Sequence, residues 1–214
     1  MALKRESTRE QITQIILERI LDGTYRPGER LIELQIAGEL NTSQAPVREA
    51  FRYLEALRVV ETEPYKGTRV RSITEQELED SSQVRAVLEE LGAQLAAPRL
   101  LADKGQLKQL EQEADAFMKA AQCKDVPGYS RHDIEFHRLI IEASGNQLLS
   151  SIWESVVLES RFRLTLKKIG EEQLCEFGEA HLPVLEAIKK GDGQAAGKLL
   201  KELICKYHFL KASK

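Results

Sequence analysis

Apolar residues recur at helical spacing in the first part of the chain, and one short interruption divides two neighbouring helices. A helix is expected over residues 7–22, a second over 33–40, and a third from Ser43 onward, where Pro46 is tolerated because first-turn N–H groups have no partner within the helix. The hydroxyl of Thr42 or Ser43 is expected to cap the third helix. Asn41 and Thr42 break the pattern, so the second and third helices predict a helix-turn-helix. The third helix is expected to bury Val47, Ala50, Phe51, Leu54 and Leu57.

Two short β-branched segments follow, at residues 59–62 and 68–71. The segment 63–67 between them contains Pro64 and Gly67, as is typical of the turn of a β-hairpin. A hairpin directly after a helix-turn-helix predicts a winged helix-turn-helix, and we assign residues 1–72 to this DNA-binding domain.

The remaining residues, 73–214, read as helices throughout, with no convincing strand after Arg71. Glycines at 145, 170, 191 and 193 separate the expected helices, which cover 75–101, 104–122, 128–143, 147–168, 171–190 and 193–210. The fold class is therefore mainly α, with a second, all-helical domain expected to be an antiparallel bundle of six or seven helices. The cores of such bundles hold ligands and metals between facing side chains.

The exposed face of the third helix carries groups that read DNA. Ser43, Gln44, Arg48 and Arg52 point away from its buried face, and an arginine such as Arg48 can contact guanine through two hydrogen bonds. The alternative for Arg48 is an ion pair with Glu49 or Glu55. Further contacts with the DNA backbone or minor groove are expected from Arg30, Lys66, Gly67 and Arg69. Ordinary solvated surface is the competing interpretation for Arg30, Arg52 and Arg69.

Charge changes this picture in one respect. The net charge is −3, and residues 1–72 hold twelve Lys and Arg against eleven Asp and Glu, a surplus of one. So small a surplus favours a homodimer, in which a second copy adds its cations to the contact with DNA.

No apolar run has membrane-spanning length and the charged start lacks the apolar core of a signal peptide, so we expect a cytoplasmic protein without a membrane partner. Cys123, Cys175 and Cys205 lie far apart and are expected to be reduced.

The same residues carry a resemblance to a known family. The run Pro27-Gly28-Glu29-Arg30-Leu31, the segment Pro46-Val47-Arg48-Glu49-Ala50, and Gly67 with Val70 resemble the DNA-binding domain of GntR-type bacterial transcription factors. The spacing is similar to that of the FadR-like subfamily, whose second half is the helical FCD effector domain. The chain departs from the family where it has Ser43-Gln44-Ala45-Pro46 in the DNA-contacting segment and Leu34 in place of an arginine. Gln44 can pair with adenine, so a different operator or a lower affinity is expected.

A metal site is the first chemical expectation for the second domain. Asp133 and His137 lie four residues apart on one helix face, and with His181 they match the FCD metal-site pattern. The resemblance implies one divalent ion, Zn or Ni. Leu203 stands where the family has its fourth ligand, and His208 is rotated by about 140° from that position on a helix of 3.6 residues per turn. Two interpretations stay open: a three-ligand site, or a decayed site that holds no metal.

Arg85 and Arg161 are the candidates for binding an effector, because a guanidinium matches the two oxygens of a carboxylate. The alternative for Arg85 is a salt bridge with Glu89. The hypothesis is a DNA-binding regulator, by resemblance a repressor, whose operator affinity responds to a small organic acid. Two alternatives remain: a DNA-binding dimer with a vestigial effector site, and a metal-dependent enzyme. No evident general base accompanies the three metal-site residues, so we do not expect an enzyme.

Overall fold

The computed structural model describes residues 8–166 and 171–208, and among these the side chains of residues 8–157 and 172–206. The chain divides into two compact units, residues 1–74 and residues 75–214. Each unit has its own core and is described by itself. Within the described ranges, no helix is both long and apolar enough to cross a membrane.

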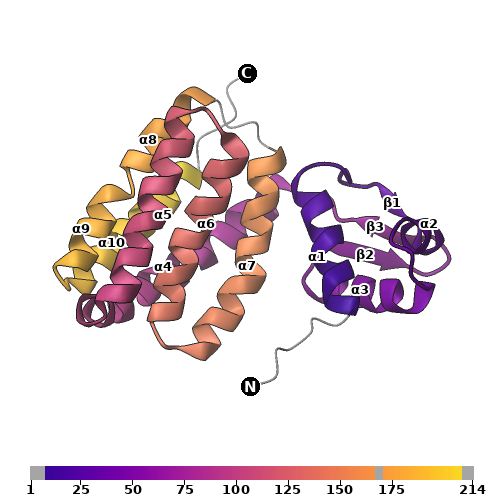
Figure 1. Cartoon of the computed structure of the whole chain (residues 1–214), viewed down its shortest axis with the longest axis horizontal. Coiled ribbons are helices and arrows are strands. Elements are labelled where there is room, and N and C mark those ends of the chain that lie inside the picture. The colour runs from indigo at the N-terminus through magenta and orange to yellow at the C-terminus, as the bar shows by residue number, and fades with distance from the viewer. Residues whose placement is uncertain (1–7, 167–170, 209–214) are drawn as a thin grey trace. The chain divides into compact units, whose positions relative to one another are not determined.

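The N-terminal unit is a winged helix-turn-helix, which confirms the predicted fold class (Figure 1). Its sheet is antiparallel with the strand order β1-β3-β2, and Glu63 pairs with Gly67 at the tip of the hairpin. The two-residue strand β1 was not expected from the sequence, because so short a segment carries no alternation of apolar and polar residues. The elements are α1 (Thr8–Leu21), β1 (Arg30–Leu31), α2 (Glu33–Glu39), α3 (Gln44–Ala56), β2 (Val60–Glu63) and β3 (Gly67–Val70).

The turn between α2 and α3 is closed by the backbone. Asn41 has a φ of 49°, and the amide of Thr42 donates to the carbonyl oxygen of Ala37 at 2.9 Å. Ser43 occupies the N-cap of α3 in an extended conformation, but it makes no side-chain cap hydrogen bond, so that expected contact is wrong. The expected buried face of α3 is present, except that Leu57 is half-buried.

The C-terminal unit is a bundle of seven α-helices in its described part, together with one short 3-10 helix (Figure 1). The single helix expected over residues 171–190 is wrong. The chain breaks at His181, which is the N-cap of α9, and Pro183 lies in the first turn, where a proline is tolerated. The elements are α4 (Glu75–Ala102), α5 (Lys104–Gln122), α6 (Val126–Ala143), α7 (Gln147–Leu166), η1 (Glu171–Gln173), α8 (Leu174–Glu179), α9 (Leu182–Lys189) and α10 (Gly193–His208).

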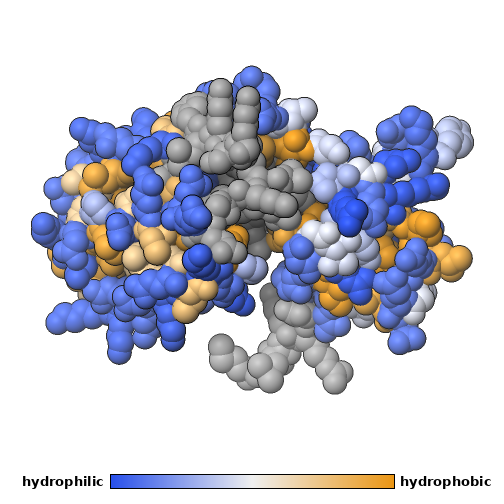
Figure 2. All heavy atoms as spheres, turned by 90° about the horizontal axis from the view of Figure 1, so that it is seen from above, coloured by the Kyte–Doolittle hydropathy of each residue, from blue (hydrophilic) through white to orange (hydrophobic). Residues whose placement is uncertain are grey.

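Helix α4 is the centre of this bundle and packs against α6, α7, α9 and α10. Helix α10 approaches it so closely that a Cβ on Gly197 would lie 2.6 Å from the carbonyl oxygen of Glu90. Phe117, Phe136 and Leu200 are among the buried residues of the core formed by these helices. Where residues are coloured in Figure 2, polar residues predominate at the surface, with apolar residues between them. The tight packing places α4, α6 and the start of α9 around one buried polar cluster.

Candidate nucleic-acid interface and candidate metal centre

Helix α3 presents a polar face to solvent. Its buried face consists of Val47, Ala50, Phe51 and Leu54, so the positions between them point outward. Ala45 of the DNA-contacting segment is exposed, and so are the four positions predicted to point outward: Ser43, Gln44, Arg48 and Arg52. They begin at the N-terminal end of the helix, which is the part of a recognition helix that contacts base edges in the major groove.

Arg48 is held by an acidic residue across the turn. Its Nε atom donates to Oε1 and Oε2 of Glu33 at 3.0 and 3.1 Å, and its Nη2 atom donates to Oε2 at 2.7 Å. The partner is therefore neither Glu49 nor Glu55. This hydrogen bonding raises the pKa of Arg48, which stays charged. Sequence analysis missed Glu33, because its distance from Arg48 depends on how the turn folds and not on helical spacing.

The cations expected around the wing are engaged to different extents. Arg69 donates to the carbonyl oxygen of Gly28 at 3.1 Å and so supports the turn that precedes β1. Lys66 forms an ion pair with Glu63, and a Cβ on Gly67 would lie 3.4 Å from the guanidinium of Arg30. Lys66 and Arg30 are exposed, whereas Arg69 is half-buried. Lys66 and Arg30 are therefore better placed than Arg69 to contact a phosphate.

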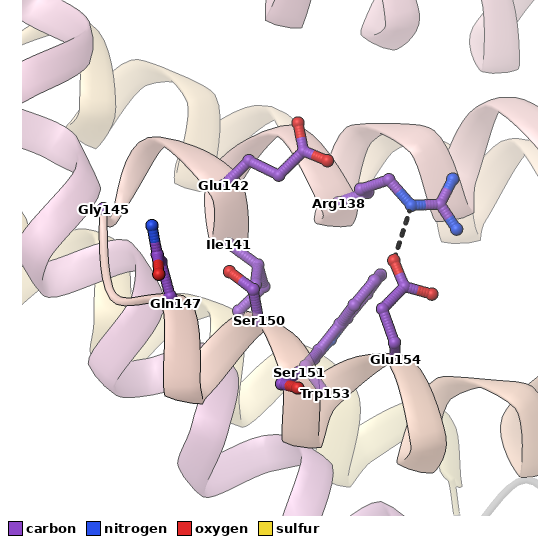
Figure 3. A pocket seen from close by; sticks show the side chains of 9 residues that line it. All are labelled: Arg138, Ile141, Glu142, Gly145, Gln147, Ser150, Ser151, Trp153 and Glu154. Atoms are coloured by element: carbon purple, nitrogen blue, oxygen red, sulfur yellow. Dashed lines mark hydrogen bonds and ion pairs between the residues drawn. The ribbon is translucent and has the colours of Figure 1, made fainter. Parts of the chain in front are cut away.

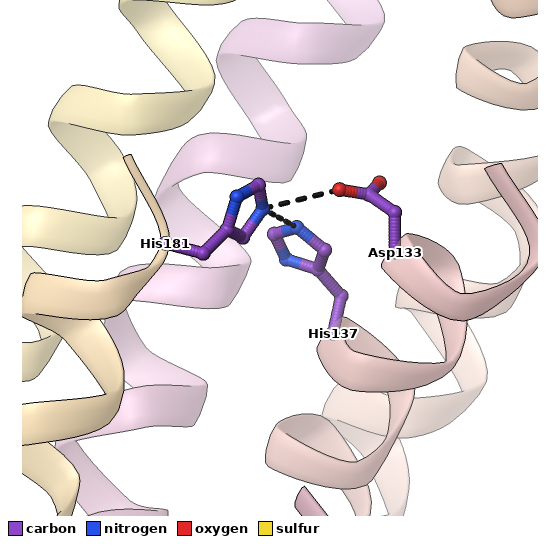
Figure 4. Close-up of side chains that lie close together, drawn as sticks. All are labelled: Asp133, His137 and His181. Carbon is purple, nitrogen blue, oxygen red and sulfur yellow. Dashed lines mark hydrogen bonds and ion pairs between the residues drawn. The ribbon is translucent and has the colours of Figure 1, made fainter. Parts of the chain in front are cut away.

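Three residues named as metal ligands converge in the C-terminal unit (Figure 4). Asp133 and His137 extend from α6 toward His181, which lies at the start of α9. The Nε2 atoms of the two histidines are 3.2 Å apart, and Nε2 of His181 is 3.1 Å from Oδ1 of Asp133. Both histidines are buried. One ligand atom from each residue lies within 4.8 Å of the others.

The opposite side of each imidazole is also occupied. Nδ1 of His137 faces the carboxylate of Glu89, and Nδ1 of His181 donates to the carbonyl oxygen of Phe177 at 2.7 Å. A carbonyl oxygen cannot donate, and an ionised carboxylate cannot either, so both Nδ1 atoms must carry the hydrogen. Neutral rings then have their lone pairs on Nε2, which is the atom that faces the other histidine. When neither Nε2 atom carries a proton, three acceptors therefore point at one another with no donor among them.

The two carboxylates of this cluster are ionised. Complete burial by itself would raise the pKa of Glu89, but Arg85, His137 and the indole N–H of Trp153 outweigh it and lower the pKa to about 2. Burial would likewise raise the pKa of Asp133, but the hydrogen bond and charge of His181, present when its Nε2 atom carries a proton, outweigh burial and lower this pKa to about 2. The cluster is thus an electron-rich pocket that requires a cation, either a proton or a metal ion.

The donor set fits a divalent ion. A tetrahedral ion with bonds of about 2.0 Å holds neighbouring ligand atoms about 3.3 Å apart, close to the 3.1 and 3.2 Å found here. Two imidazoles and one carboxylate suit zinc or nickel. Each ligating ring also has the outer hydrogen bond that fixes metal-binding histidines. With three protein ligands, a bound ion would keep a position for water or a carboxylate oxygen.

The other residues considered for effector or metal binding in this unit either belong to the core, are paired with another side chain, or lie outside the described residues. Arg85 donates through Nε to Glu89 at 2.5 Å, so its expected role as an effector clamp meets a competing salt bridge. Leu203 is a buried core residue, and His132 pairs with Glu113 at 2.7 Å. The side chains of Arg161 and His208 lie outside the described residues.

Glu89 is the functional residue that sequence analysis placed only as a partner of Arg85. It is completely buried and also accepts from Trp153 Nε1 at 2.7 Å and from His137. Its sequence signal was weak, because Glu89 lies on the face of the helix that carries small residues such as Ala86 and Ala93, and not on the stripe of larger apolar residues.

A separate pocket of about 430 Å³ opens between α6 and α7 (Figure 3). Gln147, Ser150 and Ser151 line it from α7. Its arginine, Arg138, already forms ion pairs with Glu135 and Glu154. Neither Arg85 nor the three candidate metal ligands line this pocket.

Comparison with known protein families matches both parts of the chain. Residues 8–70 match the model of the gntR family of bacterial regulatory proteins, and residues 80–205 match the FCD domain. The fold is similar to that of McbR/YncC of E. coli, with a TM-score of 0.85 and 22% identity over 95% of this chain and 96% of that one. The proteins with similar sequences are named as transcriptional regulators and not as enzymes.

Two curated relatives cover most of the chain. A protein of Paenarthrobacter nicotinovorans, described as a probable D-xylose utilization operon transcriptional repressor, is 29% identical over 96% of this chain and 89% of its own length. The gluconate operon transcriptional repressor of Bacillus subtilis (strain 168) is 26% identical over 89% of this chain and 79% of its own. With its winged helix-turn-helix followed by an FCD domain, the chain belongs to the gntR family of bacterial regulatory proteins.

Proposed function

We propose that this protein is a cytoplasmic repressor that binds a specific DNA operator and responds to a small carboxylate bound by its helical unit. The observation that carries the proposal is the exposed face of α3, where Ser43, Gln44, Arg48 and Arg52 stand free of the core. Arg48 would contact guanine and Gln44 adenine in the major groove. Lys66 and Gly67 at the wing tip, with Arg30 and Arg69, would contact the flanking backbone.

A divalent ion held by Asp133, His137 and His181 is the proposed centre of effector recognition. The ion would supply a Lewis-acid site for a carboxylate oxygen, while the protein holds both histidine rings through Glu89 and Phe177. A small sugar acid is the proposed class of effector, and the name of the gluconate operon relative supports it. Arg85 and Arg161 are the proposed contacts for the rest of the effector.

The active form is proposed to be a homodimer. Val84, Val87, Leu91 and Leu95 form an apolar stripe on α4 with exposed fractions of 36 to 57%. Their spacing of three and four residues is that of a seam between two helices. A dimer would place two recognition helices in successive major grooves of a palindromic operator. Effector and operator then influence each other through a coupling free energy of about 1 to 3 kcal/mol.

The test of DNA reading uses Arg48→Ala. An operator is first selected by the wild-type protein from a library of random duplexes. We expect the variant to lose about 1 to 3 kcal/mol of operator affinity and its discrimination at one G·C pair, because it removes a contact made to a base. Unchanged affinity and unchanged preference at physiological salt would contradict the proposal. Arg138→Ala, a change in the other unit, is the control.

The alternative function is a DNA-binding dimer without an effector. The observation that favours it is the engagement of Arg85 by Glu89, which occupies the expected carboxylate clamp. Thermal unfolding with gluconate and other sugar acids, each with and without Zn²⁺ or Ni²⁺, distinguishes the two, because a ligand of the folded state raises the melting temperature. If no compound raises it while operator binding is intact, the alternative is correct.

A further inference from the structure

The ion pair between α2 and α3 has an unusual place for an acidic group. Glu33 is the first residue of α2, and Arg48 lies in α3 beyond the turn of the helix-turn-helix. The carboxylate stands next to the surface that would meet the DNA phosphates, where a negative charge weakens binding. A role in binding must therefore act through Arg48.

The geometry of the pair leaves the reading edge of Arg48 open. Glu33 occupies the side of the guanidinium formed by Nε and one N–H of Nη2. A guanidinium has five N–H donors, so both donors of Nη1 and the second donor of Nη2 stay available. The edge formed by Nη1 and Nη2 still offers two parallel N–H donors, which is what a bidentate contact with O6 and N7 of guanine requires.

The pair also restrains a side chain that would otherwise be mobile. The Arg48 side chain is 54% exposed, whereas that of Glu33 is 28% exposed and is anchored at the start of a helix. The helix N-terminus favours a negative charge there. Ordering a long side chain before binding lowers the entropy that binding must remove.

We propose that Glu33 is a positioning residue for base recognition: it holds Arg48 with its Nη1–Nη2 edge directed at one guanine of the operator. The proposal rests on the proposed function, since it requires Arg48 to read a base. It predicts that Glu33 determines specificity although its own charge opposes DNA binding. Removing its charge should therefore lower the discrimination between bases at one position, while the affinity for nonspecific DNA rises or stays equal.

The experiment measures binding of wild-type protein, Glu33→Gln, Arg48→Ala and the double variant to the selected operator. A set of duplexes replaces each base pair in turn, and a random duplex reports nonspecific binding. The position at which Arg48→Ala loses discrimination identifies the base that Arg48 reads. Glu33→Gln should lose about threefold to tenfold of the discrimination at that same position, the range expected for losing the order of one long side chain. Its affinity for the random duplex should rise or stay equal.

The control is Glu39→Gln. Glu39 lies on the same helix, carries the same charge and forms an ion pair with Arg19 at 2.7 Å, away from Arg48. It should leave discrimination unchanged at every position. In the Arg48→Ala background, Glu33→Gln should have no further effect on discrimination.

Three results would overturn the proposal. One is a loss of base discrimination in Glu33→Gln at positions that Arg48 does not read. Another is an equal effect with and without Arg48. The third is tighter operator binding with unchanged discrimination, which would mean that Glu33 only withholds Arg48 from DNA. If the wild-type protein selects no operator, or Arg48→Ala reads every position normally, the proposed function itself fails, which is a separate outcome.

Discussion

The Nε2 atoms of His137 and His181 face each other at 3.2 Å, while the Nδ1 atom of each ring is directed to an acceptor behind it. Two lone pairs at this distance repel unless a cation joins them. The folded chain therefore holds a preformed site for a positive charge, and Asp133 adds a third ligand atom.

Added Zn²⁺ or Ni²⁺ should raise the melting temperature of the wild-type protein. At a free metal concentration one hundred times the Kd, the expected gain in folding free energy is about 2.7 kcal/mol, because the ion binds the folded state. His137→Gln should remove most of this gain. His132→Gln is the matched control, since His132 lies on the same helix but pairs with Glu113. Equal gains in both variants, measured by thermal unfolding against metal concentration, would rule out the site.

Glu89→Gln should weaken metal binding by about tenfold to one-hundredfold. The loss is expected because Glu89 fixes the ring of His137 from behind, and such outer contacts contribute this much to metal affinity. Competition with a chelator gives the affinity. The neighbouring Glu90→Gln removes a carboxylate that pairs with Lys201 on the surface, and it should leave the affinity unchanged. A loss of the same size in both variants would refute a specific role for Glu89.

Leu91→Glu should shift the protein from dimer to monomer in sedimentation equilibrium. Leu91 is 42% exposed in the middle of the α4 stripe, and a buried unpaired charge at a helix seam opposes association. Leu182 on α9 is 40% exposed outside this stripe, so Leu182→Glu changes a similar surface and should leave the dimer intact. Association that survives Leu91→Glu would place the interface elsewhere.

Gly197→Ala should destabilise the C-terminal unit by about 1 to 3 kcal/mol. Its new Cβ would press on the backbone of α4, which cannot move aside as a flexible side chain can. Gly38 lies within α2 and has nothing within 4 Å of its Cβ position, so Gly38→Ala should add about 0.5 to 1 kcal/mol of stability. Urea unfolding of both variants provides the comparison. If Gly197→Ala left the free energy of unfolding unchanged, helices α4 and α10 could move apart at little cost.

The sequence determined much of this protein by itself, because the governing interactions are local. Val47, Ala50, Phe51 and Leu54 recur at a helical period, and such a period marks a buried face wherever the helix packs. The Pro and Gly of the wing turn, and the spacing of Asp133 and His137 by one helical turn, are likewise readable along the chain. The winged helix-turn-helix and the helical bundle followed from these patterns.

Only the tertiary structure decided which groups meet. His181 reaches His137 because the chain breaks between α8 and α9, and helical periodicity alone predicted a continuous helix there. Glu89 contacts His137 of the candidate metal site, and Glu33 holds Arg48, through contacts that span 48 and 15 residues. Pairings across such separations depend on how helices pack and how a turn closes. The hydrophobic pattern of a single segment predicts neither the packing of helices nor the closure of a turn.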